Sequence, residues 1–431
     1  MTVATNATAP HVTGEGLVLA PRGSRALTTA FSRYLVQCHD RFEALPPAVS
    51  PRLRSAAEAV VARMQSLVAR DPKNGLFVYA SPTIGTPLQT LTLRDALTAF
   101  ATRIDAAIDA VGAHVLFELC ARDRFEGNDA VEWPAAPTLA SLALGIALDP
   151  PDGADSLRFE RGRIGARQGD REVGSITLAT RAVTGFRVST PYARIRDVTR
   201  FATADHNPVA AFEAHPDKHG NHVDLGGKLA SDWIASLDES FAAIERHLPE
   251  LYAEMRWLLH EVVPVGFDAE KHLSASYREA IGTVYLTLHP NGMTMTEAVI
   301  HEFQHNKLNL AAYSADFIVN AYEPLYRSPV RPDPRPLWGI LLAVHAFLPV
   351  AVLYRRMRAA GEPRTTHADF TRRLAEIDLK NHEGMEMLRA HAQWTAQGRA
   401  IFAELDALDR AHMAERAAAG ESVAPTEAHV G

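Results

Sequence analysis

The chain has little of what marks several classes of protein. Only two cysteines, Cys38 and Cys120, occur in 431 residues, and both lie in apolar helical patterns. We therefore expect buried free thiols, and neither a disulfide framework nor a thiolate metal site. Basic residues are not in excess, because 44 Lys and Arg stand against 51 Asp and Glu, a net charge of -7 at pH 7. This balance argues against a nucleic acid or an anionic membrane as partner.

Long hydrophobic runs are also absent. The longest apolar stretch, 337–354, is interrupted by Gly339, His345 and Pro349. It predicts a buried helix, because a membrane span needs about 20 mostly apolar residues. Residues 1–16 are small and polar, with no basic segment followed by an apolar run, so no signal peptide is visible. We expect a cytoplasmic protein with no membrane partner.

The remaining composition is that of a globular protein, with 47% hydrophobic and 22% charged residues. Apolar residues follow helical spacing over 25–70 and 91–121, and the segment 74–93 between them is short and turn-rich. Alternating residues from 137 to 199 predict short antiparallel strands. Further helices are expected at 230–263, 337–360, 367–388 and 391–416.

We therefore expect an α+β fold that is predominantly α-helical and includes a small antiparallel β subdomain. Four regions follow from the changes in pattern: a flexible N-terminus at 1–24, an N-terminal helical region with antiparallel strands at 25–200, a metal-binding catalytic domain at 201–416 and a disordered tail at 417–431.

The most informative feature is an HExxH motif, His301-Glu302-Phe303-Gln304-His305. Residues four apart lie one above the other on a single face of a helix. The two imidazoles can therefore converge on one divalent ion, with the Glu302 carboxylate close to the same place.

The surroundings of the motif favour a metal site. Residues 282–289 alternate like a strand, and Pro290-Asn291-Gly292 is turn chemistry. Thr294 followed by Glu297 resembles a capping box, which predicts a helix from about Met295 to Leu310. A strand, a turn and a capped helix that carries HExxH make up a zincin-like core.

The third ligand decides the chemistry, and the residues leave two candidates. Glu323 lies 18 positions after His305, as in a gluzincin protease, but Pro324 follows it and disfavours helical geometry. His345 is the better candidate, because it lies on the apolar helix predicted downstream. The segment directly after the motif has neither the glycine nor the third histidine of a metzincin.

Two arginines stand in an unusual proline-rich loop. Arg331 and Arg335 lie in Arg-Ser-Pro-Val-Arg-Pro-Asp-Pro-Arg-Pro, residues 327–336, where each proline restricts the backbone. Guanidinium groups held near a metal can bind a carboxylate in bidentate fashion. A protease needs no such group, whereas an oxygenase with a dicarboxylate co-substrate does.

At these two segments the chain resembles a known family. Thr294-Met-Thr-Glu-Ala-Val-Ile-His-Glu-Phe-Gln-His-Asn-Lys-Leu308 looks like the core of the HExxH-containing peptide-modification proteins. Ser328-Pro-Val-Arg-Pro-Asp-Pro-Arg-Pro-Leu-Trp-Gly339, which leads to the His345 helix, looks like that family's second signature. The resemblance covers about residues 230–358 closely.

The resemblance implies an iron(II)- and 2-oxoglutarate-dependent oxygenase that β-hydroxylates a side chain of a ribosomally made precursor peptide. In that case His301, His305 and His345 would hold the metal, and Arg331 or Arg335 would bind the distal carboxylate of 2-oxoglutarate. Glu302 would orient a ligand or a bound water.

Two other functions remain open at this point. The first is a zinc metallopeptidase that acts on a peptide, with Glu323 as the third ligand of Zn(II) and Glu302 as the general base. The second is a non-catalytic protein that binds a peptide.

Overall fold

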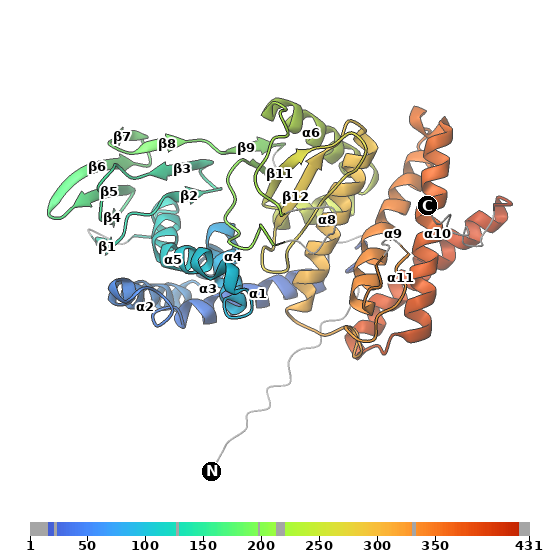
Figure 1. Ribbon diagram of the computed structural model, residues 1–431, viewed down its shortest axis with the longest axis horizontal. Helices are drawn as coiled ribbons and strands as arrows, with labels where there is room; N and C mark the ends of the chain where they lie inside the picture. Colours follow the sequence, from blue (N-terminus) through green and yellow to red (C-terminus); the bar gives the residue numbers. More distant parts are fainter. Residues whose placement is uncertain are drawn as a thin grey trace, which may run out of the picture. The chain divides into compact units, whose positions relative to one another are not determined.

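The computed structural model describes residues 16–20, 24–125, 129–196, 199–212, 220–329 and 333–421. Its contacts divide the chain into two compact units, each assembled from separate segments (Figure 1). Unit 1 comprises 1–33, 239–255 and 296–431, and unit 2 comprises 34–238 and 256–295. The boundary expected near residue 200 therefore falls inside unit 2, and the segment 256–295, expected in the catalytic domain, belongs to unit 2 as well.

Helices make up most of the regular structure, in agreement with the expected helical majority. Their bounds are α1 Arg25–Glu43, α2 Arg54–Arg70, α3 Pro72–Leu76, α4 Pro82–Thr90, α5 Ala101–Ala121, α6 Ala230–His247, α7 Pro249–Leu258, α8 Gly292–Ala312, α9 Leu337–Ala359, α10 Ala368–His391 and α11 Ala396–Ala418.

Within the described residues the strands form three sheets, all in unit 2. Their bounds are β1 Val131–Trp133, β2 Leu139–Ser141, β3 Ile146–Asp149, β4 Ser156–Glu160, β5 Arg163–Gln168, β6 Arg171–Thr177, β7 Ala182–Thr184, β8 Arg187–Ser189, β9 Tyr192–Ile195, β10 Thr199–Ala202, β11 Glu261–Phe267 and β12 Thr283–Leu288. Two sheets, ordered β1-β4-β5-β6-β7 and β2-β3-β8, are antiparallel throughout. They confirm the antiparallel β subdomain.

The third sheet, ordered β12-β11-β10-β9, pairs β10, β11 and β12 in parallel and β9 with β10 in antiparallel fashion. Its strand β11 corrects one expectation, because the helical pattern predicted up to residue 263 ends at Leu258 and a strand begins at Glu261. All residues of β12 and the first four of β11 are buried, as is usual for parallel strands.

The segment 74–93 is the second correction. It is helical rather than turn-rich, since α3, a short 3-10 helix over Phe77–Ala80 and α4 follow one another there. Pro72 and Pro82 each stand in the first turn of a helix, where the missing N–H has no partner to lose. Both prolines therefore stand at helix starts and do not interrupt the helices.

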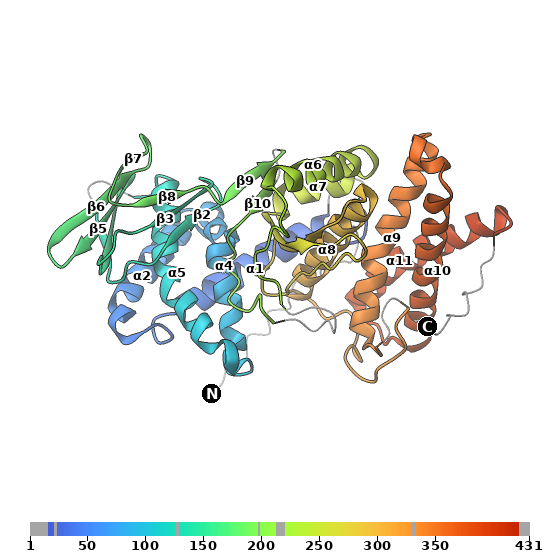
Figure 2. The same ribbon diagram turned by 45° about the horizontal axis from the view of Figure 1, so that its top comes forward.

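In unit 1, α9, α10 and α11 lie side by side (Figures 1 and 2). Among the described residues, α9 alone is long and apolar enough to cross a membrane, yet 78% of its most apolar window is buried. It is the core helix that the sequence predicts. The cysteines are confirmed as buried free thiols. The expected flexible N-terminus lies largely outside the described residues, and of the expected tail, α11 includes residues up to Ala418 while 422–431 are not described.

Two carboxyl groups are buried close together in unit 2. Glu261 Oε1 accepts a hydrogen bond from Thr283 at 2.9 Å, and Asp205 Oδ1 accepts one from the Tyr285 hydroxyl at 2.9 Å. Burial, followed by the neighbouring Asp205, raises the pKa of Glu261 to about 8. Burial also raises the pKa of Asp205 to about 6. The Glu261 side chain is therefore neutral at pH 7.

Replacing Glu261 by glutamine should flatten the pH dependence of stability. Because the folded-state pKa of Glu261 is raised, its favourable contribution is complete below pH 4.5 and is lost as the pH rises toward 8. We expect the melting temperature of wild type to fall over this range more steeply than that of E261Q, whose neutral amide keeps the Thr283 contact. The control is E172Q, which removes the charge of an exposed, ion-paired glutamate and should leave the pH dependence of the melting temperature unchanged. Equal slopes for wild type and E261Q would contradict the assignment.

Candidate metal centre

The motif lies on α8, which directly follows the strand β12 through a short turn. The helix begins at Gly292, and the Asn291 side chain caps it by accepting a hydrogen bond from the Met293 N–H at 2.9 Å. The capping box predicted at Thr294 and Glu297 is therefore wrong, because both residues lie inside the helix. Glu297 instead pairs with Arg373 of α10 at 2.7 Å. The strand, turn and helix expected around the motif are observed.

His301, Glu302 and His305 form the one cluster of potential metal ligands among the described residues, with one ligand atom of each within 4.8 Å of the others. The two imidazole rings lie 4.2 Å apart at 75°. His301 Nε2 is 3.8 Å from Glu302 Oε1, and their side chains are 20% and 3% exposed. The cluster therefore combines a buried carboxylate with two imidazoles, and the imidazole of His301 is partly exposed to solvent.

The donor set fits a divalent cation. Burial lowers the pKa of His305 to about 4, so its imidazole is neutral at pH 7 and able to ligate. Its Nδ1 is buried and has no hydrogen-bond partner among the described residues. Two imidazoles and a carboxylate are the ligand types that bind non-heme iron(II), and they also suit zinc.

His345 does not join this cluster, contrary to the expectation. Its ring is fully buried on α9, and Nε2 lies 2.9 Å from the Leu17 carbonyl oxygen, to which it donates a hydrogen bond. Phe347 occupies the place against the motif instead, with its ring 4.6 Å from that of His301. Burial, followed by the neighbouring Lys307, lowers the pKa of His345 to about 3, and His305 adds to the shift, so His345 still lies next to α8. It is its hydrogen bond to Leu17 that sets it apart from the cluster.

Glu323 and Arg335 are not brought into the cluster either. Glu323 is exposed in the segment between α8 and α9. Arg331 lies outside the described residues. Arg335 is 24% exposed, forms an ion pair with Asp333 at 2.9 Å, and its backbone pairs with that of Tyr326. The cluster formed by the described residues is therefore His301, Glu302 and His305.

The sequence did not predict the buried contacts that α8 makes beside the motif. Lys307 and Glu254 form an ion pair at 2.6 Å, with side chains 0% and 2% exposed. Lys307 and Gln304 also donate hydrogen bonds to the Val18 carbonyl oxygen, at 3.1 and 3.0 Å. A lysine next to a metal-binding motif is normally expected to be exposed to solvent. The burial of Lys307 depends on contacts with residues nearly 300 positions away in the sequence.

Residues 16–20, called the strap, are therefore bound through their backbone. Glu404 of α11 accepts hydrogen bonds from the Gly16 and Val18 N–H groups at 2.8 and 3.2 Å. The strap is therefore held by side chains from α8, α9 and α11. It was expected to be part of a flexible N-terminus, and its small residues carry no pattern that predicts these contacts.

In comparisons with known proteins, no family model matches the chain and no curated protein matches it. The functional assignment therefore depends on the site itself.

Proposed function

We propose that the protein is an iron(II)- and 2-oxoglutarate-dependent oxygenase that β-hydroxylates a side chain in a ribosomally synthesised precursor peptide. The observation that carries this proposal is the cluster of His301, Glu302 and His305. Two imidazoles and one carboxylate on neighbouring turns leave part of the coordination sphere open to other ligands. The resemblance of the motif helix and the proline-arginine loop to the HExxH peptide-modification proteins supports the choice of reaction.

Bound iron(II) with 2-oxoglutarate and dioxygen would supply the oxidising equivalents for inserting oxygen into a C–H bond. His301 and His305 would hold the ion through neutral imidazoles, since burial lowers the pKa of His305 to about 4. Glu302 would lie against the ion as a carboxylate ligand or hold a bound water in place, because its side chain is only 3% exposed and 3.8 Å from His301.

The remaining surroundings would control access. Phe347 closes one side of His301 with an apolar ring, which excludes water from that side. His301 itself is 20% exposed, so a substrate side chain would approach on this side of the cluster. Arg335, with or without Arg331, would bind the distal carboxylate of 2-oxoglutarate.

A peptide partner is supported by the segment between α8 and α9. Val319, Tyr322 and Leu325 are 70%, 61% and 59% exposed, which is unusual for large apolar side chains on neighbouring positions. Such side chains offer a contact for the precursor peptide close in sequence to the motif helix.

The decisive experiment is a visible spectrum of the apoprotein mixed anaerobically with iron(II) and 2-oxoglutarate. Chelation of the keto acid by iron(II) gives a weak charge-transfer band without any peptide. We expect the band in wild type and its loss in H301A. If no band forms while zinc binds tightly, the proposal fails and a zinc metallopeptidase with Glu302 as general base takes its place, an alternative supported by the short distance between Glu302 and His301.

Replacing Arg335 by alanine should weaken binding of 2-oxoglutarate. Loss of hydrogen bonds to a charged group costs about 1.5–3 kcal/mol, or about 10- to 100-fold in the concentration needed for half-maximal band intensity. Arg327, 72% exposed in the same loop, provides the matched control as R327A, which should leave this concentration unchanged. If the titration curve of R335A coincides with that of wild type, another residue binds the distal carboxylate of 2-oxoglutarate.

A further inference from the structure

The strap is bound in the way that proteins bind an extended peptide. Five hydrogen bonds join its backbone to side chains of unit 1. The side chains come from three helices that lie far from the strap in the sequence. They are Gln304 and Lys307 of α8, His345 of α9 and Glu404 of α11, and this set of four is called the cradle.

The cradle matches the polarity of a peptide backbone group by group. The two oxygens of Glu404 each accept one N–H, from Gly16 at 2.8 Å and from Val18 at 3.2 Å. The donors bind the carbonyl oxygens: His345 binds that of Leu17, and Gln304 and Lys307 bind that of Val18. Such main-chain hydrogen bonds give affinity whatever the side chains of the bound segment are.

The side chains of the strap show which sequence fits. Leu17 and Val18 are both 0% exposed, so the cradle buries two successive apolar side chains. Gly16 has φ +80°, a conformation that favours glycine, and a Cβ added there would come within 2.8 Å of Ala20 Cβ. The cradle therefore fits glycine followed by two apolar residues.

One end of the cradle is accessible and the other lies at the motif helix. The hydrogen bonds at Glu404 are only partly buried, and Gly16 is half-buried. The bonds from Lys307, His345 and Gln304 are buried, and Gln304 is itself part of the HExxH motif. A peptide that enters at Glu404 would therefore reach the helix that carries His301 and His305.

We propose that the cradle is a binding site for an extended peptide segment of the sequence glycine-apolar-apolar, and that the strap competes with such a segment for it. The proposed function enters only in naming the segment as part of the precursor peptide. An intramolecular competitor on a short connection acts at an effective concentration in the mM range. A free peptide at micromolar concentration should therefore bind only when the strap is released.

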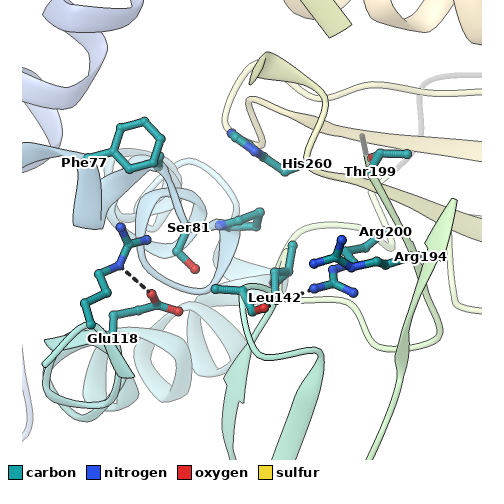
Figure 3. A pocket seen from close by; sticks show the side chains of 12 residues that line it. Phe77, Ser81, Glu118, Leu142, Arg194, Thr199, Arg200 and His260 are labelled. Atoms are coloured by element: carbon teal, nitrogen blue, oxygen red, sulfur yellow. Dashed lines mark hydrogen bonds and ion pairs between the residues drawn. The ribbon is translucent and has the colours of Figure 1, made fainter. Parts of the chain in front are cut away.

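A pocket of about 280 Å³ in unit 2 is the competing place for a peptide (Figure 3). Phe77 and Leu142 line it, together with the ion pair of Arg122 and Glu118. Phe77 is 41% exposed, so F77A changes this pocket with little disturbance of the core. A peptide bound there would respond to F77A and would not respond to a change at Glu404.

Fluorescence anisotropy of the metal-free, full-length protein tests the proposal. The probe is acetyl-Gly-Leu-Val-Leu-Ala-amide extended by a C-terminal lysine that carries fluorescein. G16V, or the milder G16A, strains the strap and should lower the Kd of the probe at least about 10-fold relative to wild type. In the G16V background, E404Q should raise the Kd about 10-fold through loss of a charged acceptor, whereas E386Q, which changes a glutamate 61% exposed on α10, should not.

A second probe checks the contact itself. N-methylation of its valine removes the N–H that corresponds to that of Val18, so this probe should bind G16V about 10-fold more weakly. Equal affinity of wild type, G16V and G16A for the first probe overturns the proposal, as does equal affinity of G16V for both probes. Weakening by F77A and not by E404Q would place the peptide in unit 2 and also overturn it. Circular dichroism confirms that each variant is folded.

The titration is independent of the metal chemistry. If the 2-oxoglutarate band fails to form and G16V still binds the probe as expected, the cradle stands and only the name of its partner as a precursor peptide is lost. If the band forms and G16V does not bind the probe, the cradle is overturned and the proposed function stands.

Discussion

Replacing His305 by alanine should abolish tight binding of iron(II) and, with it, turnover. The substitution removes one of two imidazoles, and the remaining His301 and Glu302 cannot hold a divalent ion at the same affinity. We expect a loss well above the ~100-fold that changes to outer-shell partners cause. The measurement is metal affinity by competition with a chelating dye, followed by the 2-oxoglutarate band. His367, exposed at the start of α10, is the matched control as H367A and should retain full metal binding.

The same assay decides the role of His345. Because its Nε2 donates to the Leu17 carbonyl oxygen, H345Q keeps a donor at this position and should keep the metal. If H345Q loses the ion as completely as H305A does, His345 is a ligand after all and the cluster of His301, Glu302 and His305 is incomplete.

Replacing Lys307 by methionine should cause the largest loss of stability of any single change discussed here. The substitution leaves the Glu254 carboxylate, 2% exposed, without its cation, and it removes one of the two side chains that donate to the Val18 carbonyl oxygen. Breaking a buried ion pair by removing one partner costs about 3–5 kcal/mol. Urea unfolding, followed by circular dichroism, measures the change in the free energy of unfolding.

Two variants check the cause of that loss. The double variant K307M/E254L removes both charges and should recover much of the stability lost in K307M, because no uncompensated charge remains. R372M, which breaks the exposed pair of Arg372 with Asp369, should leave the unfolding midpoint unchanged. If K307M is as stable as wild type, Glu254 must be protonated in the folded state. The raised pKa of Glu254 makes this explanation testable, because the stability of K307M would then depend on pH.

The HExxH helix could be predicted from the sequence because all its signals are local. The His301 and His305 spacing, the alternating strand before it and the turn at Asn291 act within about 25 residues of chain. Only the start of the helix was misplaced, since Asn291 caps it and the Thr294–Glu297 pattern has no capping role. The antiparallel strands were likewise recognisable from alternation and turns.

The rest of the site depends on contacts between distant segments. The choice between His345 and Phe347 is a matter of how α9 is rotated about its axis, and a helix that is apolar on most sides gives no sequence signal for that rotation.

The strap imposes an order on the synthesis and folding of this chain. Its residues leave the ribosome before those of α8, α9 and α11, yet the groups that hold it come from Gln304, Lys307, His345 and Glu404, up to 388 positions later. A nascent chain that already displays the HExxH helix therefore still lacks α9 and α11. Contacts of such long sequence separation form late, because the loop must close before any contact rewards it. If the cluster binds iron(II) as proposed, a chain that lacks α9 and α11 should consequently hold the ion poorly, because the strap is not yet bound.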